Sequence, residues 1–66
     1  MAVLKVIEVL ASSDKSWEDA TQKAVDQAAK SLKHIRSVYV QEQSAIVKDG
    51  KIVEYRVNLK LSFEIE

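Results

Sequence analysis

An unbroken alternation of apolar and polar residues is the feature that most constrains the fold of this chain. From Val53 to Ile65 every odd position is apolar, and the even positions from Glu54 to Glu66 are all polar. A two-residue period matches a β-strand, whose successive side chains point to opposite faces, and does not match a helix. The sequence therefore predicts a long strand with one covered face and one polar face.

A tight turn separates this strand from the one before it. Residues 48–51 read Lys-Asp-Gly-Lys, and Asp-Gly is a strong hairpin signal because both of its residues tolerate positive φ. We expect the preceding residues, from Arg36 to Val47, to form the partner strand of a β-hairpin.

The turn also predicts which residues of the hairpin face each other. Without a bulge, Gln43 lies opposite Arg56 on the polar face. In the same register Glu42 and Ser44 fall on the otherwise apolar face. We therefore expect a β-bulge or a subunit contact near these two residues.

The N-terminal half predicts a strand followed by a helix. Residues 3–10 are rich in β-branched and apolar types, which is typical of a short strand covered on most sides. A polar connection follows over residues 11–15. Ser16 then has the character of an N-cap, and Glu18 and Asp19 lie where the helix dipole favours acids.

The predicted helix begins at about Trp17 and ends near His34. Its apolar residues recur three and four positions apart and form a narrow, alanine-rich face that lets the helix lie close to a sheet. They are Trp17, Ala20, Ala24, Ala28 and Leu32, joined by Thr21, Val25 and Ile35. Basic residues suit the negative end of the helix dipole, and those near the predicted helix end are Lys30, Lys33, His34 and Arg36.

Together these elements predict an α+β fold with the order β-α-β-β, in a single domain of residues 1–66. The helix reverses the chain, so the first two strands run parallel and the third lies between them, antiparallel to both. The result is a three-stranded antiparallel sheet in the order 1-3-2, wrapped around one helix.

The last strand is too long for a compact chain of this size. Its roughly fifteen residues span about 50 Å at about 3.3 Å each. A compact chain of 66 residues has a radius of gyration of only about 11 Å. The strand must therefore curl around the helix or project onto a neighbour. Since a small core without disulfides is commonly stabilised by assembly, we expect an obligate homo-oligomer.

Charge balance and cysteine content exclude several classes of function. The 10 Lys and Arg residues match the 10 Asp and Glu residues, so no net charge attracts a nucleic acid or a membrane surface. No apolar run is long enough for a membrane span or a signal peptide. The absence of cysteine excludes a disulfide framework, a thiolate zinc site and a thiol nucleophile, and favours the cytoplasm.

No residue pattern supports catalysis. His34 is the one imidazole, and neither a catalytic triad nor a histidine-rich metal site can be assembled around it within one chain. Carboxylates and carbonyls of the loop formed by Ser12, Ser13 and Asp14 suit calcium, although the EF-hand spacing is absent. Trp17 either stacks on a planar ligand or, as is more common for an aromatic at a helix start, staples the helix to the core.

Hydrogen-bonding side chains line the polar face of the predicted hairpin. This ladder is either a solvated sheet surface or the wall of a site that forms when two subunits face each other. Its members are Tyr39, Gln41, Gln43, Arg56, Asn58 and Lys60.

Several short segments spread over nearly the whole chain resemble the dodecin family. They are Val6-Ile7-Glu8, Ser12-Ser13, Ser16-Trp17-Glu18-Asp19-Ala20, Ile35-Arg36, Val40-Gln41-Glu42-Gln43, Glu54-Tyr55-Arg56-Val57 and Leu61-Ser62-Phe63. The resemblance implies a small β-α-β-β protein that assembles into a hollow homododecamer. It also implies storage or sequestration of a small ligand without catalysis, by default a flavin such as FMN or riboflavin bound at subunit interfaces.

The resemblance also indicates where a flavin would bind. Flavin-binding members have a stacking tryptophan early in the second strand and a hydrogen-bonding glutamine in the third, positions held here by Ser37 and Arg56. Serine has no aromatic face, and arginine donates hydrogen bonds but cannot accept them. The implied site comprises Ser37, Tyr39, Gln43 and Arg56 across a two-fold axis. The alternatives are a calcium-binding assembly and a purely structural one.

Overall fold

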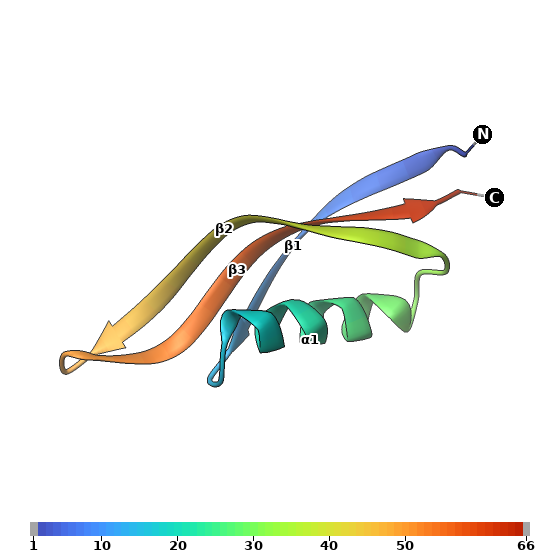
Figure 1. Cartoon of the computed structure of the whole chain (residues 1–66). Coiled ribbons are helices and arrows are strands. Elements are labelled where there is room, and N and C mark those ends of the chain that lie inside the picture. The colour runs from blue at the N-terminus through green and yellow to red at the C-terminus, as the bar shows by residue number, and fades with distance from the viewer. Residues whose placement is uncertain (1, 66) are drawn as a thin grey trace.

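The computed structural model describes residues 2–65 as a three-stranded sheet with one helix packed against it (Figure 1). The elements are β1 (Leu4–Ser13), α1 (Trp17–Ala29), β2 (Ile35–Lys48) and β3 (Lys51–Glu64). The strand order is β1-β3-β2 and both pairings are antiparallel, which confirms the predicted fold class. Met1 and Glu66, the two ends of the predicted domain, lie outside the described residues.

The alternating strand β3 lies at the centre of the sheet and supplies most of the core. Val57, Leu59 and Leu61 are almost completely buried, and Val57 and Leu59 pack against Ala20 and Ala24 of α1. Small alanine side chains let the helix axis approach the sheet closely, so the apolar face of β3 is covered. Val9, Ala11 and Trp17 complete the core at its edges.

Helix α1 begins as predicted but ends earlier. Ser16 is the N-cap, and its hydroxyl accepts a hydrogen bond from the backbone N–H of Asp19 at 2.9 Å. The prediction that the helix ends near His34 is wrong, because α1 ends at Ala29 and its last turn contains no basic residue. The chain must turn back into the sheet: His34 has a φ of 60° and its carbonyl accepts a hydrogen bond from the N–H of Glu64.

Strand β1 is longer than predicted. It continues beyond the predicted range of residues 3–10 through Ser13, because Ser12 pairs with Arg56 and Ser13 with Tyr55 on β3. Part of the predicted polar connection therefore belongs to the sheet.

The hairpin between β2 and β3 has the predicted turn and a bulge. Asp49 and Gly50 both have positive φ, 53° and 76°. The pairing shifts by one residue between Val40 and Glu42, which confirms a bulge in the predicted region and leaves Gln41 as the extra residue.

Another irregularity lies between Ile46 and Val47, where Val53 of β3 is the extra residue, and it shifts the pairings from Ile46 to Glu42 by one residue. The bulge at Gln41 ends this shifted segment. Gln43 lies opposite Val57, so the predicted opposition of Gln43 and Arg56 is wrong. Ser44 lies opposite Arg56 instead. A one-residue shift exchanges the two faces of a strand, so Glu42 and Ser44 leave the apolar face where the simple register had placed them.

The molecule is elongated. Its principal extents are 50 × 20 × 13 Å and its radius of gyration is 13.5 Å, against about 11 Å for a compact chain of this length. Figure 1 shows the hairpin end of β2 and β3 projecting past the start of α1. Many large apolar side chains stay exposed, among them Val3, Leu4, Val6, Leu10, Val47, Ile52, Val53 and Ile65. No helix within residues 2–65 is long and apolar enough to cross a membrane.

Candidate functional site: the outer face of the sheet

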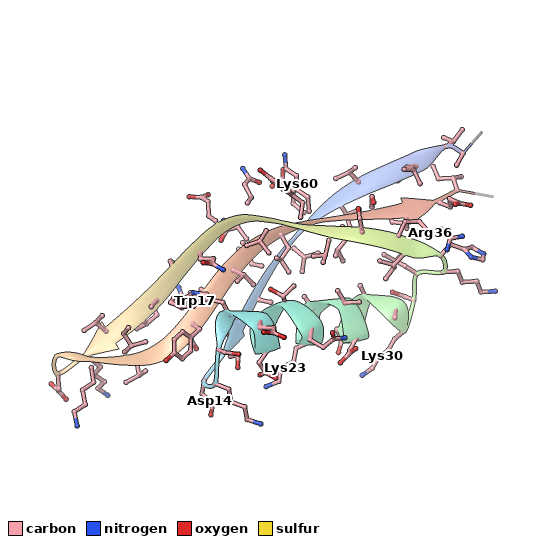
Figure 2. The ribbon with its side chains drawn as sticks, in the orientation of Figure 1. Asp14, Trp17, Lys23, Lys30, Arg36 and Lys60 are labelled. Carbon is pink, nitrogen blue, oxygen red and sulfur yellow. The ribbon has the colours of Figure 1, made fainter. Side chains whose placement is uncertain are left out.

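The face of the sheet turned away from α1, here called the outer face, holds most of the polar side chains of β3. Because Val57, Leu59 and Leu61 point toward the helix, the residues between them point the opposite way. Lys60 shows this orientation in Figure 2. Residues directly opposite one another on neighbouring strands share a face, so the outer face can be followed across all three strands.

A hollow on the outer face is centred on Arg56. Ser12 of β1 and Ser44 of β2 lie directly opposite Arg56 on its two sides. The hollow has a volume of about 460 Å³ and is lined by Leu10, Ala11, Ser12, Ser44, Arg56, Val57 and Asn58. Two serines beside a long arginine leave this space because their side chains are short.

An ion pair occupies one nitrogen of the Arg56 guanidinium. Nε of Arg56 donates to Oε2 of Glu54 at 2.9 Å, with the two side chains 55% and 36% exposed. The guanidinium fork has five N–H donors in all, so four more belong to its terminal nitrogens.

Trp17 supports the hollow from the helix side. Its indole Nε1 donates a hydrogen bond to the carbonyl oxygen of Ser44 at 2.8 Å. Its ring packs edge to face against Tyr55, with the centroids 4.9 Å apart and the planes at 76°. Both contacts hold α1 against the hairpin, and the structure therefore favours the stapling interpretation of Trp17.

Ser13 fixes the other edge of the hollow. This buried residue donates from its hydroxyl to Oδ2 of Asp19 at 2.5 Å and accepts from the backbone N–H of Lys15 at 2.9 Å. The hydrogen bond from Ser13, followed by that from Lys23, lowers the pKa of Asp19 below its ordinary value of 3.8. Lys23 Nζ lies 3.2 Å from the same carboxylate oxygen.

The predicted calcium loop is therefore only partly available for a metal. The Ser13 hydroxyl already has two partners, which leaves the exposed Asp14 and the backbone carbonyls of the loop as oxygen ligands. Within residues 2–65 no three side chains of His, Cys, Asp or Glu gather closely enough to hold a metal ion.

The structure places three of the four predicted flavin-site residues on the outer face. Ser37 hydrogen-bonds through its hydroxyl to Ser62, and Tyr39 lies opposite Lys60 with 62% of its surface exposed. Arg56 lies in the hollow. Gln43 lies opposite Val57, on the helix side of the sheet.

One chain does not bring these residues into a single pocket. Ser37 lies beside Ser62, which is about 20 Å from Arg56 along β3 at about 3.3 Å per residue. A site that contains both Ser37 and Arg56 therefore needs a second subunit facing the first.

Sequence reasoning missed Ser12 and Ser44 as neighbours of Arg56. The predicted first strand stopped before Ser12, since serine is typical of loops, and the simple hairpin register placed Ser44 opposite Tyr55. An irregularity at Val53 of β3, next to the turn, is the signal that finds Ser44, because it shifts the pairing by one residue.

Comparison with known proteins gives a consistent picture. The model of the Dodecin family matches residues 3–66. The calcium dodecin of Mycobacterium tuberculosis is 38% identical over 65 residues, which cover 98% of this chain and 92% of that protein. The dodecin of Thermus thermophilus is 31% identical over 64 residues, covering 97% and 93% of the two chains.

Solved structures show the same fold. The dodecin of Streptomyces coelicolor superposes with a TM-score of 0.93 at 28% identity, covering 98% of this chain and 93% of that one. A crystal structure of the calcium dodecin of Mycobacterium tuberculosis, described as a calcium-chelating antigen with a novel calcium-binding site, gives a TM-score of 0.84 at 41% identity. Its coverage is also 98% and 93%.

Proposed function

Since this chain belongs to the dodecin family, we propose that it forms a hollow homododecamer that holds a small ligand between subunits without catalysing a reaction. The observation that supports assembly is the distribution of apolar residues. Within residues 2–65 more large apolar side chains are exposed than buried, and they lie on both ends of an elongated molecule. Exposed apolar surface of this extent is typical of a subunit interface.

The first ligand to test is a flavin, either FMN or riboflavin. The outer face offers Tyr39 as an exposed aromatic ring and Arg56 as a hydrogen-bond donor. Ser37 and Arg56 replace the tryptophan and glutamine of the flavin-binding pattern, so we expect weaker stacking than that pattern gives, by about 1 kcal/mol for each lost aromatic pair. Gln43 is left out of this site because it lies on the helix side.

Native mass spectrometry of protein purified without added cofactor tests the assembly and the ligand together. We expect a species of twelve subunits, and quenching of flavin fluorescence when the protein is titrated into micromolar FMN or riboflavin. A monomer contradicts the proposed assembly. A dodecamer that quenches neither flavin contradicts flavin binding and leaves the assembly intact.

Calcium is a second candidate ligand, favoured by the similarity to a protein named calcium dodecin. Asp14 is exposed in the loop after β1, and hard oxygen ligands of this kind suit Ca²⁺. Calcium binding predicts that the midpoint of thermal unfolding rises with added CaCl₂ and falls with a chelator. Asp14→Asn should remove this response, and Asp26→Asn, on the exposed surface of α1, should retain it. A midpoint insensitive to both reagents contradicts calcium binding.

A further inference from the structure

The hollow around Arg56 is lined by hydrogen-bond donors and by no acidic side chain. Arg56 provides a permanently charged planar fork, Ser12 and Ser44 each provide a hydroxyl, and Asn58 provides an amide. Leu10 and the alanine beside it complete the wall. A set of this kind matches a ligand group rich in acceptor atoms, above all an oxyanion that arginine can bind through two parallel hydrogen bonds.

The register places these donors around one point. Neighbouring strands lie about 4.8 Å apart, so Ser12 and Ser44 flank Arg56 at about that distance on either side. Ser12 and Ser44 are therefore about 10 Å apart, and a phosphate or carboxylate group bound by Arg56 between them has one hydroxyl on each side.

Contacts with α1 hold the two serines in place before any ligand binds. The Trp17 indole fixes the backbone of Ser44, and the hydrogen bond from Ser13 to Asp19 anchors the residue next to Ser12. The site is therefore built on paired strands that are tied to the helix from behind, which lowers the entropic cost of ordering it around a ligand.

Glu54 is the counter-ion of Arg56. Its carboxylate accepts from Nε of Arg56, and the terminal nitrogens of the guanidinium carry four further N–H donors for a ligand. Glu42 also lies on the outer face, opposite Asn58 in the adjacent row. Both acids repel an anion, and Glu54, which is paired with Arg56, has the larger effect on anion affinity.

We propose that Arg56, together with Ser12 and Ser44, is a binding subsite for an oxyanion of the phosphate or carboxylate type carried by the stored ligand. The inference rests on the proposed small-ligand function and specifies one chemical group of that ligand.

Inorganic phosphate is the first probe. Binding to the purified assembly is measured by isothermal titration calorimetry at constant ionic strength, and native mass spectrometry and circular dichroism confirm that each variant assembles and folds. Arg56→Gln should weaken phosphate binding at least about tenfold, because it removes the charge-assisted hydrogen bonds. Glu54→Gln should strengthen it.

Arg36→Gln is the matched control. Arg36 forms the same kind of ion pair, with its Nε 2.9 Å from Oε1 of Glu64, and its side chain is 51% exposed. The control should bind phosphate like the wild type. Equal affinity in Arg56→Gln and the wild type, or an equal loss in Arg36→Gln, overturns the subsite.

A second pair of probes separates this inference from the proposed flavin function. FMN and riboflavin differ by one phosphate group, so tighter binding of FMN that falls in Arg56→Gln to the level of riboflavin, with riboflavin binding unchanged, supports the subsite. An equal loss for both flavins in Arg56→Gln places Arg56 at the ring and overturns the subsite. If neither flavin binds but the binding of inorganic phosphate still depends on Arg56, the flavin proposal fails and the subsite stands. If both flavins bind equally well and Arg56→Gln changes nothing, the subsite fails and the flavin function stands.

Discussion

The Ser13 side chain shows how one residue joins two elements. Its buried hydroxyl donates to Asp19 in the first turn of α1 and accepts from the Lys15 backbone, so the loop between β1 and α1 has one geometry. The same hydrogen bond stabilises the charged form of Asp19 and lowers its pKa. Folding and the ionisation of Asp19 are therefore coupled.

This coupling predicts a loss of stability in acid. A carboxyl whose folded pKa lies below its unfolded value of 3.8 stabilises the fold above that value, and the stabilisation is lost as the pH falls through the folded pKa. Asp19→Asn should be less stable than the wild type at pH 7 and should lose less stability between about pH 5 and about pH 2. Urea unfolding across that range measures both effects. Asp26→Asn, an exposed change on the same helix, serves as the control, and identical pH slopes for Asp19→Asn and wild type contradict the coupling.

A second prediction concerns the indole N–H of Trp17. Trp17→Phe keeps an aromatic ring against Tyr55 but leaves the Ser44 carbonyl without its donor. We expect the free energy of unfolding to fall by about 1 kcal/mol. Denaturant unfolding measures the change, and Tyr55→Phe, which retains the ring pair, should be close to the wild type. Full stability of Trp17→Phe would show that the hydrogen bond contributes nothing.

Among the elements, β2 shows most clearly what could be predicted from the sequence. Glu42 and Ser44 conflict with the simple hairpin register, which predicts a bulge or a subunit contact near them, yet alternation alone does not say which residue is extra. Two extra residues bound the shifted segment: Val53 of β3 begins the segment, which moves Gln43 away from Arg56 and brings Ser44 opposite it, and Gln41 ends it.

The end of α1 was mispredicted for a different reason. Basic residues after Ala29 suited a longer helix, but the chain needs residues 30–34 to reach the first paired residue of β2. The local sequence favours a helix that continues past Ala29. The helix ends there because the chain has to cover the distance to the start of β2. The central strand β3 can be predicted from the sequence because its apolar and polar residues alternate, and over residues 56–62 the buried and more exposed side chains alternate in the same way.

Deleting Gln41 tests the role of the bulge. The deletion removes the extra residue and leaves the pairings on both sides of it in register, because Val40 and Glu42 lie opposite the consecutive residues Leu59 and Asn58. We expect Glu42 and Ser44 to stay on the outer face and unfolding to remain cooperative. Gln41→Ala keeps the backbone and should change stability by no more than about 0.5 kcal/mol. Thermal melts followed by circular dichroism compare the two, and a deletion variant without a cooperative transition contradicts this account.

At the scale of the whole molecule, the core is small because the chain is elongated and leaves many apolar side chains exposed. The largest fully buried side chains are Val57, Leu59 and Leu61, while the projecting hairpin end exposes apolar side chains that no part of residues 2–65 covers. Under the proposed assembly a neighbouring subunit covers them, and the stability of the fold depends on that contact.

Val47 at the projecting end provides the test. It is 61% exposed in the single chain, so a change there scarcely affects the core. Val47→Asp should shift the mass distribution toward smaller species and lower the thermal midpoint, because a carboxylate would be desolvated at a subunit contact. Val47→Thr, which keeps the β-branched shape, should remain assembled. Native mass spectrometry measures the number of subunits in each variant. An intact assembly in Val47→Asp would place the hairpin end of β2 and β3 outside the interface.

The position of β3 between the other strands has a consequence for biosynthesis. β1 and β2 are made first, yet within the described residues each pairs in the sheet only with β3. While a ribosome is still adding β2, neither strand has a partner and α1 has no sheet to pack against. Contacts between such distant parts of a chain form slowly, and unpaired strands are prone to aggregate. The sheet and the core of this protein can therefore form only after β3 has emerged.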